Sequence, residues 1–546
     1  MATIKQHDKR SGKTYVYESV SYWDKAKKQS RSKRRLIGRY DEETGLVVDT
    51  DGRRRASDAT TAKQVARQAE AVAGSPLAFR KFCGVTLLLD DIAGAIGLKD
   101  DLKACFPDTY RMILSVAYYM IQEDKSPLYR FRRWDSLHLH PHGRDIPSQR
   151  SSELFAAITE EQRMRFFRLQ GGRRRESEYL AYDTTSLSSY SECLTQVKYG
   201  KNKDYDPLPQ TNLLLIFGEE SYLPFYYRKI AGNIPDSATV RVCLDELGLA
   251  GHSGLKLVKD RGFFTVANVD ALFAQKTRFL IGAKMGSSIV HKAALKVCDT
   301  VRDWSRYDDK LGIYMDTECA AWESEVARPR KGDTVTVRHR VYIHVYYNPE
   351  LALEDELRLN ARISELKSEL ESGKPARQNK NLYDKYFVTR KTRGGLSVKL
   401  RQEVYDEEKR LYGFFALMSN DVKDARTALR IYRNKDVVEK AFGNYKERLN
   451  GRRMLVSSDL SLAGKLFVQF VALIILSYIN KHMSDNDMYK KYTTSSLLDE
   501  LETIECYKCS DGKPRLGEIL EKQREIFRCM GVDEPSQSSL CIMSGI

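Results

Sequence analysis

No apolar run in the sequence is long enough to cross a membrane as a helix. The best candidate, LFVQFVALIILSYI at residues 466–479, has about 14 residues, whereas a helix needs about 20 to span a bilayer. The first ten residues, MATIKQHDKR, also lack the apolar core of a signal peptide. We therefore expect a cytoplasmic protein without a membrane partner, and we expect residues 466–479 to form a buried helix of a large core.

Cysteine is present but scattered, which excludes a framework of closely spaced disulfides. The ten cysteines suit a reducing compartment. One group stays open, because Cys506 and Cys509 form a CxxC pair that Cys529 and Cys541 follow. The second pair is spaced too widely for a standard four-thiolate zinc site, and buried single thiols are the alternative.

A complete ATP-binding loop is also missing. Residues 11–14, SGKT, match the end of that motif, but His7 occupies the position of its first glycine. We therefore exclude ATP as a partner. The sequence contains no internal repeat either.

Charge is strongly unbalanced toward cations. Lysine and arginine number 90 against 74 aspartates and glutamates, which gives a formal net charge of +16. Residues 25–39, KAKKQSRSKRRLIGR, hold eight cations and no acid, and RRR recurs at 53–55 and 173–175. Such clusters favour contact with the phosphates of a nucleic acid, and solvated loops are the alternative.

Hydrophobic patterning predicts several structural regions. With 546 residues, 42% of them hydrophobic, the chain can bury a large core in about three or four domains. Residues 12–50 predict short strands, and residues 57–170 predict mainly helices. A series β-β-β-α-β-α-β follows, which is typical of antiparallel hairpins followed by parallel crossovers. Its expected strands are 178–186, 212–218, 222–232, 254–264 and 278–284, and its expected helices are 237–250 and 265–275.

Residues 286–408 interrupt this series. They contain strand-like pieces at 310–316 and 335–347, a charged helix at 354–371 and a loop of linker composition at 372–381. Residues 410–421 then predict a returning strand.

Two aspartates stand at the ends of apolar strand segments. Asp183 follows YLAY and precedes TTS, and Asp260 follows LKLVK and precedes RGFF. Sites in open α/β sheets form at the carboxyl ends of strands, and a right-handed crossover can bring the fourth strand beside the first. That arrangement would put the two carboxylates side by side. Taken singly, each aspartate could also be a cap or a turn residue.

A third carboxylate lies in the predicted helix IYRNKDVVEKAFGNYKERLNGRRMLV, residues 431–456. Tyr432, Lys435, Glu439 and Lys446 fall within about 60° of one another on a helical wheel. This stripe lies at the edge of an apolar face, and a solvated face of Glu–Lys pairs is the alternative. The apolar face comprises Ile431, Val438, Ala441, Phe442, Tyr445 and Leu449.

The three carboxylates together would need a counter-charge. Hard oxygen ligands suit Mg²⁺ or Mn²⁺ rather than zinc. Two such ions would activate a water or a 3′-hydroxyl for attack on a phosphodiester.

These motifs resemble those of bacterial insertion-sequence transposases of the DDE type. The insertion-sequence-four superfamily carries its last acid in the pattern Y-x2-R-x3-E-x6-K, which here is Tyr432, Lys435, Glu439 and Lys446. The spacings match, and the one departure is a lysine in place of the arginine. Lysine is a point charge, whereas arginine grips phosphate through a planar fork.

The two aspartates match the same superfamily. Its first acid typically begins D-x-T, here Asp183, and its second begins D-x-G-F, here Asp260. GNIPDSATV at 232–240 resembles the G-N-x-x-D-S stretch between them. The resemblance covers about residues 178–284 and 410–480.

The resemblance implies an α/β catalytic core with an RNase H-like mixed sheet flanked by helices, interrupted by a β-rich insertion. Asp183, Asp260 and Glu439 would be the catalytic and metal-binding residues, with Mg²⁺ or Mn²⁺ as cofactor. The reaction would be cleavage at the ends of the element, followed by transfer of the 3′-hydroxyl to target DNA. The implied DNA contacts are Tyr432, Lys435, Lys446, Arg452 and Arg453.

Partners and alternatives follow from the same resemblance. Double-stranded DNA would include the terminal inverted repeats and the target, and the protein would act as a homodimer associated with the nucleoid. Some relatives flip a base onto an aromatic residue, for which Trp304 and Trp322 are candidates unless they are core residues. A nuclease without strand transfer and a captured transposase that only binds DNA are the alternative functions.

The predicted division of the chain follows the expected elements. Its parts are a basic β-rich arm (1–56), a helical DNA-binding region (57–175), the first part of the catalytic core (176–285), the insertion with its charged helix (286–408), the second part of the core (409–485) and a tail that could dimerise (486–546).

Overall fold

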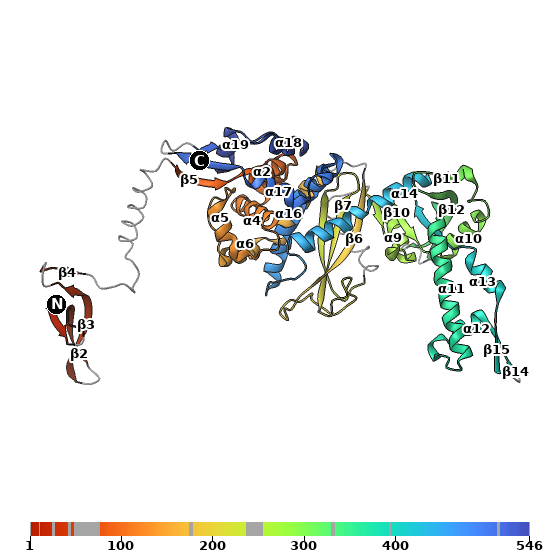
Figure 1. Cartoon of the computed structure of the whole chain (residues 1–546), viewed down its shortest axis with the longest axis horizontal. Coiled ribbons are helices and arrows are strands. Elements are labelled where there is room, and N and C mark those ends of the chain that lie inside the picture. Colours follow the sequence, from red (N-terminus) through yellow and green to blue (C-terminus); the bar gives the residue numbers. More distant parts are fainter. Residues whose placement is uncertain are drawn as a thin grey trace. The chain divides into compact units, whose positions relative to one another are not determined.

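The computed structural model describes residues 2–9, 11–24, 28–41, 45–48, 77–173, 178–235, 255–328, 333–392, 395–509 and 514–544. Two expected helical segments, 57–76 and 237–250, lie outside these residues. The chain divides into two compact units, one of residues 1–78 with 509–512 and one of residues 79–508 with 513–546 (Figure 1).

The N-terminal unit is an antiparallel sheet in the order β1-β2-β3-β4. Its strands are β1 (Ala2–Asp8), β2 (Lys13–Asp24), β3 (Gln29–Tyr40) and β4 (Val47–Val48). The predicted strands are confirmed, and β1 is an additional strand. Within its described part only Val16, Ser19 and Gly38 are buried, because β3 is too rich in cations to cover a core.

The described part of the predicted helical region begins with one strand, residues 77–82, and is mainly helical from Gly84 onward. Its helices are α2 (Gly84–Ala95), α3 (Leu98–Cys105), α4 (Tyr110–Gln122), η1 (Leu128–Arg130), α5 (Phe131–Leu137), α6 (Ser148–Ala157) and α7 (Glu160–Gly172).

The long helix α16 (Asp459–Asp485) packs against α4 and α6 and contains the apolar run 466–479. By length and composition it could cross a membrane, but 89% of its most apolar stretch is buried in the fold. Gly464 permits close packing, since a Cβ there would lie 2.0 Å from the carbonyl oxygen of Phe155. The expected buried helix is therefore confirmed.

A nine-stranded mixed sheet in the order β11-β12-β13-β16-β10-β9-β6-β7-β8 forms the centre of the second unit. Strands β6, β7 and β8 are antiparallel neighbours, and β9 and β10 run parallel to β6. Because β9 pairs directly with β6, the expected crossover of the fourth strand to the first is confirmed. The five predicted strands are β6 (Tyr179–Ser188), β7 (Gln210–Gly218), β8 (Pro224–Ala231), β9 (Lys256–Lys259) and β10 (Arg278–Ala283).

The connection from β9 to β10 consists of η2 (Arg261–Phe263) and α9 (Val266–Ala274), the second expected helix. Thr265 begins α9, because its side chain accepts a hydrogen bond from the amide of Asn268.

The segment between β10 and β16 (Phe414–Ser419) extends the same sheet. Strand β16 pairs with both β10 and β13, and all these pairings are antiparallel. The predicted returning strand is therefore confirmed. The other elements here are α10 (Ser288–Val297), η3 (Trp304–Arg306), β11 (Tyr307–Asp308), β12 (Ile313–Arg328) and β13 (Asp333–Tyr347).

The charged helix α11 (Pro349–Glu371) is also confirmed, and it has a small core of its own. The expectation of a loop at 372–381 is wrong in part, since helical structure begins at Arg377. Tyr383 and Tyr386 anchor a helical turn and α12 against α11 there. The elements are η4 (Arg377–Asn379), α12 (Lys380–Tyr386), β14 (Phe387–Thr392), β15 (Gly395–Leu400) and α13 (Gln402–Lys409).

The tail after α16 is more ordered than its sequence suggests. Strand β17 lies between β18 and β5 (Leu77–Phe82), the strand that precedes α2. The elements are η6 (Met488–Lys490), α17 (Thr494–Glu502), β17 (Glu505–Cys509), β18 (Pro514–Leu516), α18 (Glu521–Cys529) and α19 (Gln537–Ser544).

The four cysteines of the candidate zinc site are only partly described. Cys506 is buried and Cys529 is half-buried, while the side chains of Cys509 and Cys541 lie outside the described residues. The zinc site therefore stays untested.

Candidate active site

The two predicted aspartates occupy matching positions on adjacent parallel strands. Strands β6 and β9 pair residue by residue up to Tyr182 and Lys259. Asp183 and Asp260 are the next residues, so they lie level with each other where β9 ends. The ring of Phe263, in the turn after Asp260, packs edge-on against Tyr182 with ring centroids 5.0 Å apart. Since neighbouring strands lie about 4.8 Å apart, both carboxyl groups reach one region of the sheet.

Tyr432 holds the carboxylate of Asp260. It lies near the end of α14 (Ala425–Asn434), and its hydroxyl donates a hydrogen bond of 2.6 Å to Asp260 Oδ1. The tyrosine reaches across Gly282 of β10. A Cβ on Gly282 would lie 2.7 Å from that hydroxyl oxygen and 2.8 Å from the backbone nitrogen of Arg261. The contact therefore requires a glycine at position 282.

Lys435 links Asp260 to Glu439. Its Nζ lies 3.7 Å from Asp260 Oδ1 and 3.7 Å from Glu439 Oε1. The side chain of Lys435 is only 16% exposed, whereas Asp260 and Glu439 keep 49% and 63% of theirs exposed. The largely buried ammonium of Lys435 thus contacts two carboxylates that remain exposed to solvent.

These contacts set the charge of Asp260. Burial alone would raise the pKa of Asp260, but the Tyr432 hydroxyl and the charge of Lys435 outweigh burial and lower it. Burial and the neighbouring carboxylate raise the pKa of Tyr432. At neutral pH Asp260 is therefore an anion, and Tyr432 is a neutral hydrogen-bond donor.

Asp183 has an ammonium group of its own. Lys203 lies in the connection from β6 to β7, and its Nζ is 3.4 Å from Asp183 Oδ1. The same Nζ donates to the carbonyl oxygen of Thr184 at 2.6 Å and to its Oγ1 at 2.9 Å. Sequence reasoning missed Lys203, because nothing in KNKDYD distinguishes one loop lysine as a neighbour of Asp183.

The donor set fits the expected metal in its chemistry. Asp183, Asp260 and Glu439 offer carboxylate oxygens, which Mg²⁺ and Mn²⁺ prefer. Within the described part of the chain, no three acidic, histidine or cysteine side chains are close enough to enclose one ion. Lys203 and Lys435 supply the positive charge that the three acids require.

The helical segment that carries Glu439 is not one α-helix, as the wheel assumed. It consists of α14, α15 (Asp436–Gly443) and the π-helical turn η5 (Asn444–Arg448), with a break at Lys435. Asp424 begins α14 by accepting a hydrogen bond from the amide of Thr427. The predicted apolar face is confirmed, since Ile431, Val438, Ala441, Phe442, Tyr445 and Leu449 are all buried.

The π-helical turn changes the position of Lys446. Its wider turn shifts the residues after Gly443 away from their places on an α-helical wheel. Lys446 contacts Asp204, with its Nζ 2.8 and 2.6 Å from the two carboxylate oxygens. That Lys446 shares one stripe with Glu439 stays a prediction.

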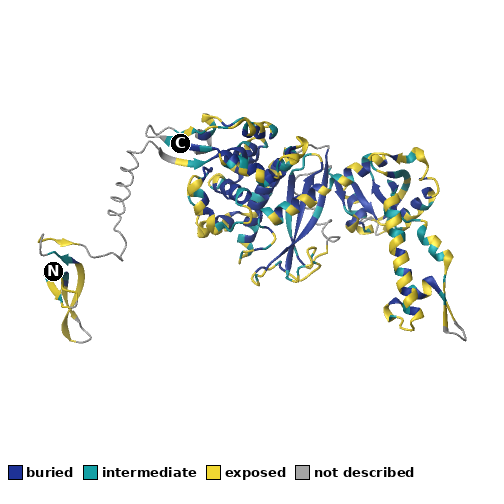
Figure 2. Cartoon of the chain, viewed as in Figure 1, coloured by how far each residue is buried: buried dark blue, intermediate teal, exposed yellow. Residues whose placement is uncertain are grey.

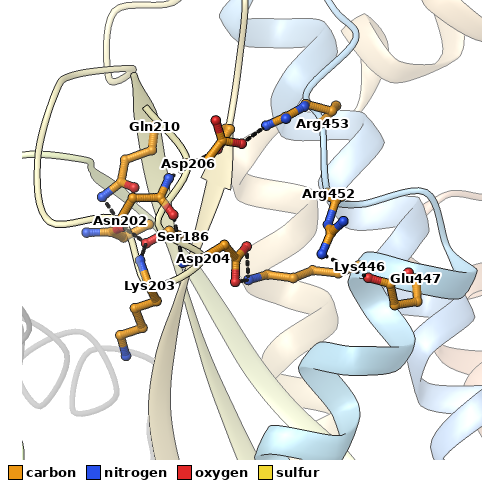
Figure 3. A network of polar contacts seen from close by, with 12 residues as sticks. Ser186, Asn202, Lys203, Asp204, Asp206, Gln210, Lys446, Glu447, Arg452 and Arg453 are labelled. Carbon is orange, nitrogen blue, oxygen red and sulfur yellow. Dashed lines mark hydrogen bonds and ion pairs between the residues drawn. The ribbon is translucent and has the colours of Figure 1, made fainter. Parts of the chain in front are cut away.

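The three cations near the end of this segment that were predicted to contact DNA, Lys446, Arg452 and Arg453, are paired with acids (Figure 3). Lys446 is only 10% exposed in its pair with Asp204. Arg453 pairs with Asp206, whose pKa this contact lowers, and Arg452 lies 3.4 Å from Glu447. The predicted DNA contacts thus have protein partners in this structure.

Asp204 and Asp206 lie in the same connection as Lys203, and its backbone is fixed by hydrogen bonds to β6 (Figure 3). The amide of Lys203 donates to Ser186 Oγ at 3.2 Å, and Asn202 Nδ2 donates to Ser188 Oγ at 3.1 Å. This short segment, residues 202–206, therefore contacts both Asp183 and the basic end of the helical segment.

The two tryptophans proposed for base stacking differ. Trp322 is 6% exposed, and its Nε1 donates a hydrogen bond of 2.8 Å to Asp270 Oδ1, so it is a core residue. Trp304 is 83% exposed.

Comparisons with known proteins found similarity to solved structures. No protein-family model and no curated protein matches the sequence. Among solved structures, the chain is similar to the piggyBac transposase in its cryo-EM synaptic complex with hairpin DNA. The match covers 77% of this chain and 76% of that chain, with 10% sequence identity and a TM-score of 0.34.

Proposed function

We propose that this protein is a DNA transposase of the DDE type, similar to those of the insertion-sequence-four superfamily. It cleaves DNA at the ends of its element and transfers the freed 3′-hydroxyl to target DNA. The observation that carries the proposal is the level placement of Asp183 and Asp260 on adjacent parallel strands, with Tyr432 and Lys435 in contact with Asp260 and Lys435 also in contact with Glu439. A mixed sheet of an antiparallel trio and two parallel strands supports an RNase H-like core.

In this proposal Asp183, Asp260 and Glu439 hold Mg²⁺ or Mn²⁺. When bound, the ions lower the pKa of the attacking water or hydroxyl and stabilise the leaving oxygen. Tyr432 fixes the orientation of the Asp260 carboxylate through its hydrogen bond. Once a metal neutralises Asp260 and Glu439, the ammonium of Lys435 can pair with a DNA phosphate instead.

Lys446, Arg452 and Arg453 bind the DNA backbone in this proposal. Each of these three cations must exchange its carboxylate partner for a phosphate, and it keeps an anionic partner in doing so. The DNA partners are the terminal inverted repeats and the target. The proposal also includes a homodimer that holds two ends, located in the cytoplasm on the nucleoid.

The test compares the purified wild-type protein with Glu439→Gln on linear DNA carrying the element's ends, with a supercoiled target. Glutamine keeps the shape of the side chain and removes the charge that would hold metal. Asp436→Asn is the matched control, because it removes one exposed carboxylate from the same helix. Nicked ends and joined products are measured on a gel with and without Mg²⁺.

We expect the wild type and Asp436→Asn to cut and join only with Mg²⁺, and Glu439→Gln to bind DNA but do neither. Cutting without joining would favour a nuclease, and binding without cutting by the wild type would favour a captured DNA-binding protein. Full activity in Glu439→Gln would remove Glu439 from the site.

A further inference from the structure

The hairpin of β2 and β3 is longer than the sheet that contains it. The two strands pair from Thr14 with Tyr40 to Asp24 with Gln29. Strand β1 pairs only with residues 13–19, and β4 pairs only with Arg39 and Tyr40. Within the described residues, the last five pairs, from Val20 with Lys33 to Asp24 with Gln29, have no further strand beside them. We call these five pairs the ribbon.

The described side chains of the ribbon are exposed to solvent on both faces (Figure 2). Val20 is 41% exposed, Tyr22 is 48% exposed and Trp23 is 62% exposed. Residues 29–33 are all exposed as well. A two-stranded ribbon without a core is marginal by itself, so it gains from a surface that covers it.

Cross-strand register divides the ribbon into two unlike faces. Residues opposite each other in an antiparallel pair share a face, and alternate residues change face. Arg31 stands opposite Tyr22, and Lys33 stands opposite Val20. Arg35 continues this face beyond the ribbon, opposite Glu18. The other face carries Ser30 and Ser32 opposite Trp23 and Ser21. The first face thus carries the two cations of the ribbon beside Val20 and Tyr22, and by register the last pair, Asp24 with Gln29, belongs to it as well. The other face consists of hydroxyls and one tryptophan.

The dimensions match a groove of duplex DNA. Five residue pairs extend roughly 17 Å, and two strands lie about 4.8 Å apart before their side chains are added. The major groove of B-form DNA is about 12 Å wide and admits a two-stranded ribbon. The major groove of an A-form RNA duplex is too narrow and deep for side chains to read. Strand β3 contains no acid, so its charge complements phosphates along its whole length.

We propose that the ribbon inserts into the major groove of duplex DNA with the face of Arg31 and Lys33 toward the base edges. Arginine and lysine on that face would meet the acceptors of guanine, while neighbouring cations of β3 contact the phosphates. This inference rests on the proposed function for its choice of DNA as the partner. The proposal assigns recognition of the DNA sequence to the N-terminal unit, separately from cleavage.

The experiment uses the full chain without Mg²⁺, so that binding is measured without cleavage. A random-sequence duplex pool is enriched by the wild type, and the enriched duplex is then probed with dimethyl sulfate, which methylates guanine N7 in the major groove. The test variant is the double substitution Arg31→Gln and Lys33→Gln. The matched control is Ser30→Ala with Ser32→Ala, on the opposite face of the same strand.

We expect the wild type and the serine control to protect guanine N7 on the enriched duplex. The Arg31→Gln, Lys33→Gln variant should lose that protection, with affinity at least about tenfold lower, since it lacks both side chains that would contact guanine. An unchanged pattern of protection in the variant would overturn the proposal. So would failure to enrich any duplex, or equal binding to an RNA duplex or to anionic phosphatidylserine vesicles that depends on the same two cations.

Cleavage is assayed separately with Mg²⁺. Binding through the ribbon by a chain that never cuts would reject the proposed function and keep this inference. If the variant cleaves DNA as well as the wild type does, the result would reject this inference and keep the proposed function. Circular dichroism on each variant checks that the sheet remains folded.

Discussion

Two clusters along residues 425–453 combine cations and carboxylates in opposite proportions. At the break between α14 and α15 one cation lies between two acids, since Lys435 contacts Asp260 and Glu439. After Gly443 two acids hold two cations, since Asp204 pairs with Lys446 and Asp206 pairs with Arg453. The first cluster keeps two open carboxylates that could accept metal. In the proposed function the cations of the second cluster bind phosphates, which would then replace Asp204 and Asp206 as their partners.

This comparison separates two kinds of residue that the sequence motif treats alike. Glu439 and Lys446 belong to one spaced pattern, yet they lie in different electrostatic environments. Substitutions at the first cluster should therefore change chemistry, whereas substitutions at the second should change DNA affinity.

The largest effect is expected for Asp260→Asn. In the proposed function Asp260 is a metal ligand, and a bound metal contributes several kcal/mol, so nicking should fall by about 10³-fold or more. DNA binding in a mobility-shift assay should stay within about threefold of the wild type, since binding depends mainly on cations. Nicking above a tenth of the wild-type rate would exclude Asp260 as a ligand.

Gly282→Ala should have the next largest effect. The new Cβ would push against the Tyr432 hydroxyl and the backbone of Arg261, so the Asp260 carboxylate should lose its fixed orientation. A displacement of about 1 Å can cost about 100-fold in rate. Gly286→Ala is the control, because a Cβ there has no atom within 4 Å. Nicking rates and thermal unfolding are measured on both, and equal rates would reject this role for Gly282.

Tyr432→Phe tests the pKa of Asp260. The hydroxyl stabilises the carboxylate, so its loss should raise the pKa of Asp260 and move the acid limb of the pH–rate profile to higher pH. The rate at neutral pH should fall by about tenfold at most, because the carboxylate is half exposed. The depressed pKa also stabilises the fold above about pH 4, and this stabilisation disappears as pH falls through the pKa of the folded state. An unmoved acid limb would show that Asp260 does not control the titration.

The smallest effect, and the one of opposite sign, is expected for Asp204→Asn with Asp206→Asn. Removing both acids releases Lys446 and Arg453 for contact with phosphates, so DNA binding should tighten by about three- to tenfold. The salt dependence of binding should steepen by about one to two units. The charge-matched control is Asp108→Asn with Asp124→Asn, two exposed aspartates of the helical region. Equal tightening in the control would mean that only net charge matters.

Much of the central sheet could be predicted because its strands carry continuous apolar runs. The pairing of β9 with β6 follows from the handedness of crossovers, and it brings Asp183 level with Asp260. The additional strand β1 was missed because IKQHD lacks a strong β pattern. The tail strands β17 and β18 were missed because they are short and depend on β5 for a partner.

The details of the site were less predictable. Tyr432 and Lys435 were expected as DNA contacts, and the structure shows both at Asp260. Lys203, Asp204 and Asp206 gave no signal, since charged residues in a loop are usually solvated. Gly282 gave no signal either, because a glycine within a strand can have several structural explanations.

The sequence by itself determined the strand series, the buried helix α16 and the positions of three acids, because apolar periodicity and motif spacing are local properties of a chain. Tertiary structure alone decided which cation pairs with which acid. Those pairs join residues far apart in the chain, as Asp260 with Lys435 and Asp204 with Lys446 do. They depend on strand register, on the break at Lys435 and on the π-helical turn, none of which spacing along the chain encodes.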